Sequence, residues 1–299
     1  MLNKILMGVV IALLIVAIIP PLATHVHEME WKVVQEPTCT EPGTRRASCS
    51  CGKLQVELIQ PKGHTISIVD NKQVKCTTCG QEAASQGLRY ELINGKEYKV
   101  DAGKCTEPII VIPSTWQGKP VTTIAHGAFA NMQITEVYIP DSITTILDDA
   151  FYCCHYLEKV LFLGESKLKV IDRDVFYLCG KLSQIDIPQT VTKIDHCAFY
   201  QCYSLRDIEL PSKLEYIGDF AFNMCDITTV TIPSTVNYIG LCAFENCPSL
   251  VSVQFEYTGP WSLSNMYGET ATVYTTQPQR NAKYLVEYNN YARFLWEKK

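Results

Sequence analysis

A repeat of 22–25 residues fills the middle of the chain and constrains its fold more than any other feature. Each unit begins with L-x-x-V-x-I-P or a close variant, continues with V-x-x-I, and ends with A-F-x-x-C. The units start at Ile134, Leu157, Leu182, Leu205 and Ile227; a sixth begins at Leu250 and fades, and an incomplete one precedes them. A fixed period of this length predicts a solenoid in which each unit forms one coil.

Each part of the unit has a predictable place in such a coil. The alternation in L-x-x-V-x-I predicts a short strand with inward apolar side chains. A proline then ends the strand where a missing N–H does no harm, at Pro140, Pro188, Pro211 and Pro233. The phenylalanines should stack as an aromatic spine made of Phe129, Phe151, Phe176, Phe199, Phe222 and Phe244. No unit can bury its apolar face alone, so the coils must stack.

These motifs resemble the BspA-type (treponemal) leucine-rich repeat over about residues 87–255, and "GLRYELINGKEYKV" resembles the entry cap of that family. The resemblance implies a β-rich α/β solenoid, wound as a right-handed coil with short convex 3-10 or helical turns. It also implies an adhesion or surface-antigen type of role. Function is carried by sites rather than folds, so this role is an analogy.

The last segment, residues 256–299, is expected to cap the solenoid. Leu285, Tyr288, Tyr291 or Ala292, and Leu295 fall at helical spacing, which predicts an amphipathic helix over the open end of the stack. A helix that binds a partner is the alternative interpretation of the same pattern.

One cysteine recurs three residues after the spine phenylalanine, at Cys154, Cys179, Cys202, Cys225 and Cys247. We expect a structural ladder of reduced thiols, because free cysteine packs as a small hydrophobe. Neighbouring coils would bring the ladder positions to about 4.8 Å, but parallel Cβ vectors do not favour disulfides.

Other cysteines and histidines in the coils fall at variable positions of the repeat. His196 shares its place with aspartate, arginine and leucine, and Cys197 shares its place with glycine, aspartate and phenylalanine. A nucleophile pair needs side chains that converge on one pocket, whereas neighbours on a tight turn diverge. His155, beside Cys153, is interpreted in the same way, and incidental metal affinity is the alternative.

No catalytic motif is evident in the sequence: there is no phosphate loop, no HExxH and no nucleophile elbow. We therefore predict a protein that is not an enzyme, with a thiol or hydrolytic enzyme as the weaker alternative. The formal net charge is −5 with no basic stripe, which argues against a nucleic-acid partner.

The outward positions of the predicted strands form the candidate binding face. Its residues are Glu136, Tyr138, Lys159, Leu161, Gln184, Asp186, Asp207, Glu209, Thr229, Thr231, Ser252 and Gln254. Solenoid faces of this kind bind extended ligands. We expect a protein or glycan ligand on a host or bacterial surface. The alternatives are a face that is only solvated and a solenoid that serves as a spacer or scaffold of the cell envelope.

The first 24 residues predict the compartment. After Lys4, an uncharged apolar run of 19 residues extends from Ile5 to Ala23, just long enough to span a bilayer. We expect a single-pass transmembrane anchor; a cleaved signal peptide with secretion is the alternative. Either interpretation places residues 25–299 outside the cytoplasm.

The segment from 25 to 86 is polar and contains "CSCG" and "CTTCG". Cysteine pairs followed by glycine are typical zinc ligands, and so short a segment with few large apolar side chains needs a staple. We expect a zinc-ribbon-like module with one structural zinc; disulfides or unpaired thiols are the alternatives. The segment also resembles a small histidine/cysteine module of surface proteins from anaerobic Gram-positive bacteria, through His27, Trp31, Thr38-Cys39, Gly43, Cys49/Cys51-Gly52 and Gly63-His64. The candidate ligands are His27, Cys39, Cys49, Cys51, His64, Cys76 and Cys79.

Overall fold

The computed structural model divides the chain into two compact units, Met1–Gly63 and His64–Lys299. It describes residues 28–37, 43–50, 52–59, 66–69, 73–77, 80, 82–265, 267–287 and 292–299. The predicted membrane anchor, residues 1–24, lies outside the described residues. Within the described ranges, no helix is long and apolar enough to cross a membrane.

The first unit contains an antiparallel sheet of β1 (Glu30–Gln35), β2 (Gly43–Ser48) and β3 (Leu54–Ile59), with β2 in the centre. On one face, the Arg45 guanidinium lies 4.6 Å from the Trp31 ring centre and its Nη2 lies 2.6 Å from a Glu57 carboxylate oxygen. These side chains bridge all three strands and hold their register.

The second unit begins with a hairpin of β4 (Ile66–Val69) and β5 (Gln73–Cys76), followed by a short segment that packs on the first coils. Val74 and Ala83 join an apolar cluster with Val111, Tyr138 and Leu163. The boundary between the compact units therefore falls inside the segment from 25 to 86, and its second half belongs to the solenoid unit.

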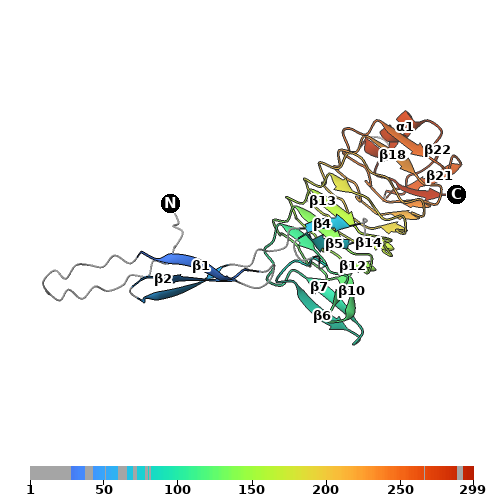
Figure 1. Cartoon of the computed structure of the whole chain (residues 1–299). Coiled ribbons are helices and arrows are strands. Elements are labelled where there is room, and N and C mark those ends of the chain that lie inside the picture. Colours follow the sequence, from blue (N-terminus) through green and yellow to red (C-terminus); the bar gives the residue numbers. More distant parts are fainter. Residues whose placement is uncertain are drawn as a thin grey trace. The chain divides into compact units, whose positions relative to one another are not determined.

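The solenoid starts with an antiparallel hairpin of β6 (Arg89–Ile93) and β7 (Glu97–Asp101), where the sequence resembles an entry cap. From β7 onward the chain winds into coils stacked side by side, as Figure 1 shows. Each coil has two strand positions and one turn, and the apolar core runs through the middle of the stack.

The L-x-x-V-x-I segments form the first strand side, which is parallel and consists of two separate sheets. The larger sheet contains β8 (Ile109–Val111), β11 (Glu136–Ile139), β13 (Lys159–Phe162) and β15 (Gln184–Ile185); the smaller contains β18 (Thr229–Ile232) and β20 (Ser252–Phe255). Val137, Val160 and Ile185 are in register, so their side chains point to the same buried face. Residues 205–210 lie between the two sheets and, although fully described, contain no strand.

The V-x-x-I segments form the second strand side. Near the entry, β10 (Lys119–Ile124) pairs with β7, with β12 (Thr145–Ile146) and with the short β9 (Thr115–Trp116). Further along, β14 (Val170–Ile171), β16 (Lys193–Ile194), β17 (Tyr216–Ile217) and β19 (Tyr238–Ile239) pair in parallel. The isoleucines of these strands are fully buried in the core.

The third side consists of the A-F-x-x-C turns, which repeat from coil to coil without interruption. The six spine phenylalanines are buried and stacked, with successive ring centres 5.2–5.5 Å apart. Two residues per turn, such as Cys197 and Gln201, have positive φ, so alternate N–H groups point along the stack. The N–H groups of Cys197, Phe199 and Gln201 donate to the carbonyls of Asp219, Ala221 and Asn223 in the next coil.

The turns correct one expectation, because they are not helical. A helix satisfies its N–H groups within its own segment, whereas these turns send every second N–H to the next coil. Only the N–H groups between them, such as those of Tyr200 and Cys202, donate three residues back within the turn. Across the described residues there is a single helix, α1 (Pro278–Val286).

The C-terminal cap differs from the predicted helix. Helix α1 ends at Val286, and Leu295 lies in β23 (Leu295–Lys298); Tyr288 and Tyr291 lie outside the described residues. Strand β23 pairs antiparallel with β19 and with β21 (Pro260–Ser264), which pairs with β22 (Thr270–Tyr274). A strand satisfies the open edge of β19, which a helix cannot do, and this explains the switch.

Candidate binding face

The first coils of the predicted binding face are partly buried by the segment that precedes the solenoid. Tyr138 is only 7% exposed, because Val74 and Ala83 pack against it, and Leu161 is partly buried by the same cluster. The Tyr138 hydroxyl donates to a Glu136 carboxylate oxygen at 2.6 Å, and burial with this bond raises the pKa of Tyr138 to about 12. Tyr138 is therefore a packing residue, which corrects the prediction that it faces a ligand.

The middle and end of the face are open to solvent. Seven of the predicted side chains are exposed: Gln184, Asp186, Asp207, Glu209, Thr229, Thr231 and Gln254. Glu136, Lys159, Leu161 and Ser252 are half-buried. The usable part of the face thus runs from β15 to β20, and it includes the break between the two sheets.

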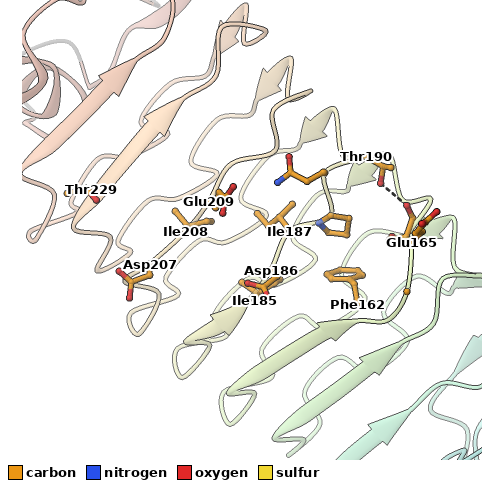
Figure 2. A pocket seen from close by; sticks show the side chains of 14 residues that line it. Phe162, Glu165, Ile185, Asp186, Ile187, Thr190, Asp207, Ile208, Glu209 and Thr229 are labelled. Atoms are coloured by element: carbon orange, nitrogen blue, oxygen red, sulfur yellow. Dashed lines mark hydrogen bonds between the residues drawn. The ribbon is translucent and has the colours of Figure 1, made fainter. Parts of the chain in front are cut away.

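A groove of about 830 Å³ lies at this break (Figure 2). Its apolar lining consists of the partly buried Phe162 and Ile208 and the buried Ile185 and Ile187, and its carboxylates come from Glu165, Asp186, Asp207 and Glu209. The volume falls in the range of about 300–1,000 Å³ that is usual for ligand pockets.

The inward residues show how the groove forms. Val160, Ile185 and Val230 are at most 7% exposed, whereas Ile208, the corresponding residue of the broken coil, is only partly buried. The repeat pattern places Asp186 and Glu209 at equivalent positions of adjacent coils. Like charges directly opposite each other destabilise strand pairing, and aspartate is a poor strand former. Both effects explain why the sheet stops at β15.

Sequence reasoning named the outward carboxylates but missed the groove and its apolar lining. The signal was present: two consecutive units, "IDIP" and "IELP", carry an acid between their apolar positions, and the next unit, "VTIP", carries threonine. Acidic residues at equivalent positions of adjacent coils, without basic residues beside them, predict weak pairing between the two strands.

The ladder cysteines occupy a uniform site in the core. All five are at most 1% exposed and have free thiols. Each thiol donates to the backbone carbonyl of the phenylalanine one coil earlier, over 3.1–3.3 Å. Burial raises the pKa of Cys154 to about 12, and it raises the pKa of Cys179, Cys202 and Cys225 well above the usual range. These thiols are protonated at neutral pH and are poor nucleophiles.

His196 and Cys197 do not form a reactive pair. The His196 ring meets the Phe220 ring edge-on at 5.9 Å, and burial raises the pKa of Cys197 to about 12. A nucleophilic thiol needs the opposite shift. At the other variable position, a ring nitrogen of His155 lies 3.1 Å from the Leu178 carbonyl.

The candidate zinc ligands are only partly described. Cys49 and Cys76 are both buried, and they belong to different compact units. His27, Cys39, Cys51, His64 and Cys79 lie outside the described residues. Among the side chains that are described, no group of three or more metal-binding residues comes together.

Comparison with known proteins supports the solenoid assignment. Residues 122–251 match the BspA type leucine rich repeat region, in six copies. No protein with a curated description matches the chain.

Several solved structures are similar. A leucine rich cell surface protein from Faecalibacterium prausnitzii is 24% identical with a TM-score of 0.50, covering 66% of this chain and 61% of its own. A leucine-rich repeat protein from Bacteroides ovatus is 28% identical with a TM-score of 0.40, covering 58% and 41%. A leucine rich repeat protein from T. pallidum is 27% identical with a TM-score of 0.42, covering 58% and 71%. The first likeness shows the fold, and this chain spans about three-fifths of that protein's length.

Proposed function

We propose, from the premise that residues 122–251 form a BspA-type leucine-rich repeat region, that this is a non-enzymatic protein displayed on the cell surface. In this proposal the first strand side of the solenoid binds a protein or glycan on a host or bacterial surface. The observation that carries the proposal is the open stretch from β15 to β20, where exposed polar side chains surround an acidic groove.

The chemistry of the described residues supports binding rather than catalysis. The buried thiols have raised pKa values, and His196 packs against an aromatic ring edge instead of a thiol. A rigid stack of coils presents its outward side chains at a fixed spacing, which lowers the entropic cost of binding an extended ligand.

Display on the surface rests on the apolar segment from Ile5 to Ala23, which we propose as a single-pass anchor or a signal peptide. One structural zinc held by residues of the segment 25–86 is likewise a proposal. Metal analysis of the purified full chain tests it: one zinc per chain that is removed by a chelator supports the proposal. No zinc, together with thiols that react only after reduction, contradicts it.

Charge reversal on the open face tests the binding role. We would measure binding of the full chain to intact bacterial and epithelial cells, with Asp186→Lys, Asp207→Lys and Glu209→Lys combined. The matched control reverses three exposed acids elsewhere, Glu30→Lys, Glu215→Lys and Glu297→Lys. We expect the face variant to lose about tenfold or more in affinity and the control to retain it. Equal binding by both folded variants would contradict the proposed face and favour a spacer or scaffold of the cell envelope.

A further inference from the structure

The groove at the break in the first strand side is lined by negatively charged side chains. The described residues that line it include Glu165, Asp186, Asp207 and Glu209, but no lysine, arginine or histidine. Arg206 is next to Asp207 in sequence, yet its Nε donates to Asp226 at 2.7 Å. Asp226 also accepts a hydrogen bond from Ser249, and neither Arg206 nor Asp226 lines the groove. The groove acids therefore have no basic neighbour in their lining, and a ligand would have to supply the positive charge.

Backbone groups at the break are available as well. The N–H groups of Asp207, Ile208 and Glu209 have no hydrogen-bond partner within the described part of the chain. In the two adjacent coils the corresponding segments are strands: β15 pairs with β13, and β18 pairs with β20. Unpaired amides at the edge of a sheet, such as those at this break, are the groups that an extended peptide satisfies when it binds.

The apolar part of the lining completes the pattern. Its accessible groups are Phe162 and Ile208, which are partly buried and lie among the carboxylates in Figure 2, whereas Ile187 is only 5% exposed. A metal ion or small amine would neutralise the acids but would leave this apolar surface and the amides uncovered. An extended peptide alternates its side chains, so it can place aliphatic groups on Phe162 and Ile208 and cationic groups on the acids.

We propose that this groove binds an extended segment of a partner protein in which lysine or arginine alternates with aliphatic residues. The proposal rests on the proposed function and names its ligand class: a basic polypeptide rather than a glycan. Aliphatic side chains cover Phe162 and Ile208, while ammonium or guanidinium groups pair with Asp186, Asp207 and Glu209. Peptide carbonyls accept from the free amides at the break.

The test uses the full chain and a labelled, blocked peptide of about eight residues that alternates lysine and valine. Fluorescence anisotropy measures its dissociation constant. The groove variant combines Asp207→Asn with Glu209→Gln, and the matched control combines Glu215→Gln with Glu297→Gln, which removes the same charge from exposed sites. We expect binding to weaken about tenfold or more in the groove variant and to change little in the control.

Two further measurements identify the ligand class. A glutamate–valine peptide should not bind, and a peptide of the same composition with lysines and valines in separate blocks should bind several-fold more weakly. Equal binding of the alternating and block peptides, or equal weakening in the two variants, would mean charge attraction alone and would overturn the proposal. Binding of calcium or of an amino-sugar oligomer at the groove acids without binding of the alternating peptide would overturn it too.

The outcome can be separated from that of the proposed function. If the alternating peptide fails to bind but the lysine substitutions still abolish cell binding, the face is correct and the ligand class is wrong. If the peptide binds the groove but no cell surface is bound, the ligand class stands and the surface role fails.

Discussion

The turn side and the first strand side of the solenoid are built from the same coils but behave differently. On the turn side, every coil from Phe129 to Phe244 repeats the same ring contact and the same thiol-to-carbonyl hydrogen bond where a cysteine is present. On the strand side, pairing ends at β15 and resumes only at β18. One side therefore fixes the register of the stack, and the other can lose its pairing without loss of register.

The difference shows where such a fold tolerates a functional site. The turn side is dry, aromatic and hydrogen-bonded to its neighbours, so a change there disturbs at least two coils. The strand side meets solvent, so acids can replace threonines at the cost of a few local hydrogen bonds. A break in the less constrained side gives a groove inside a rigid frame, and four experiments test this interpretation.

The largest expected effect is on the turn side. Phe199→Ala removes a fully buried ring between Phe176 and Phe222 and should lower the free energy of unfolding by about 3–5 kcal/mol. Urea denaturation measures this. Tyr203→Ala, at a side chain that is 53% exposed, is the control and should change stability by less than about 0.5 kcal/mol. A small effect at Phe199 would mean that the spine does not hold the coils together.

The ladder thiols should make stability depend on alkaline pH. The Cys154 pKa is about 9 when unfolded and about 12 when folded, so the unfolded state loses its proton first as pH rises. Its contribution is complete below about pH 9 and is lost between about 9 and 12, at up to about 1.4 kcal/mol per pH unit. Urea midpoints between about pH 8 and 10.5 should fall less steeply for Cys154→Ala than for the wild type. Parallel slopes would show that the thiol is not buried.

Loss of an ion pair at the C-terminal end of the stack should lower the free energy of unfolding by a smaller amount. Arg293 Nε lies 2.9 Å from Glu245, whose side chain is 6% exposed while that of Arg293 is 52% exposed. Arg293→Met should destabilise the protein by about 1–2 kcal/mol, since it leaves a buried carboxylate without its cation. Combining it with Glu245→Gln should recover part of the loss. A double variant as unstable as the sum of the single variants would show that the two residues are not coupled.

The smallest effect comes from repairing the break. Asp207→Thr with Glu209→Thr copies the pattern of β18 and removes the like-charge contact with Asp186. We expect a gain of about 0.5–1 kcal/mol in unfolding free energy. Hydrogen exchange should show new protection of the amides at 207–209. Continued fast exchange would mean that something other than charge interrupts the sheet, and then the two sides differ for another reason.

The features that depend on a single repeating unit could be predicted from the sequence. The spine, the ladder positions and the inward valines and isoleucines follow from spacing alone, because every coil repeats the same local rule. Tyr138 could not be placed, since its burial depends on Val74 and Ala83, which are outside the repeat. The strand at Leu295 was missed because helical spacing is local, whereas the open edge of β19 is created by the whole stack. The groove was missed because it depends on the contact between two units and not on either one.

The hydrogen bonds of the turns have a consequence for how such a protein changes length. Each coil passes the same set of N–H donors to its successor, and at the end the Ala292 carbonyl accepts from Cys242 as another coil would. Because the C-terminal cap accepts this hydrogen bond in the same way as a further coil, it can end a stack of any number of coils. Whole coils can therefore be added or removed. Each coil added before the acidic groove moves the groove along the stack by about 4.8 Å. Duplication or deletion of one repeat unit before the groove therefore changes the distance between the groove and the N-terminal end of the stack in fixed steps.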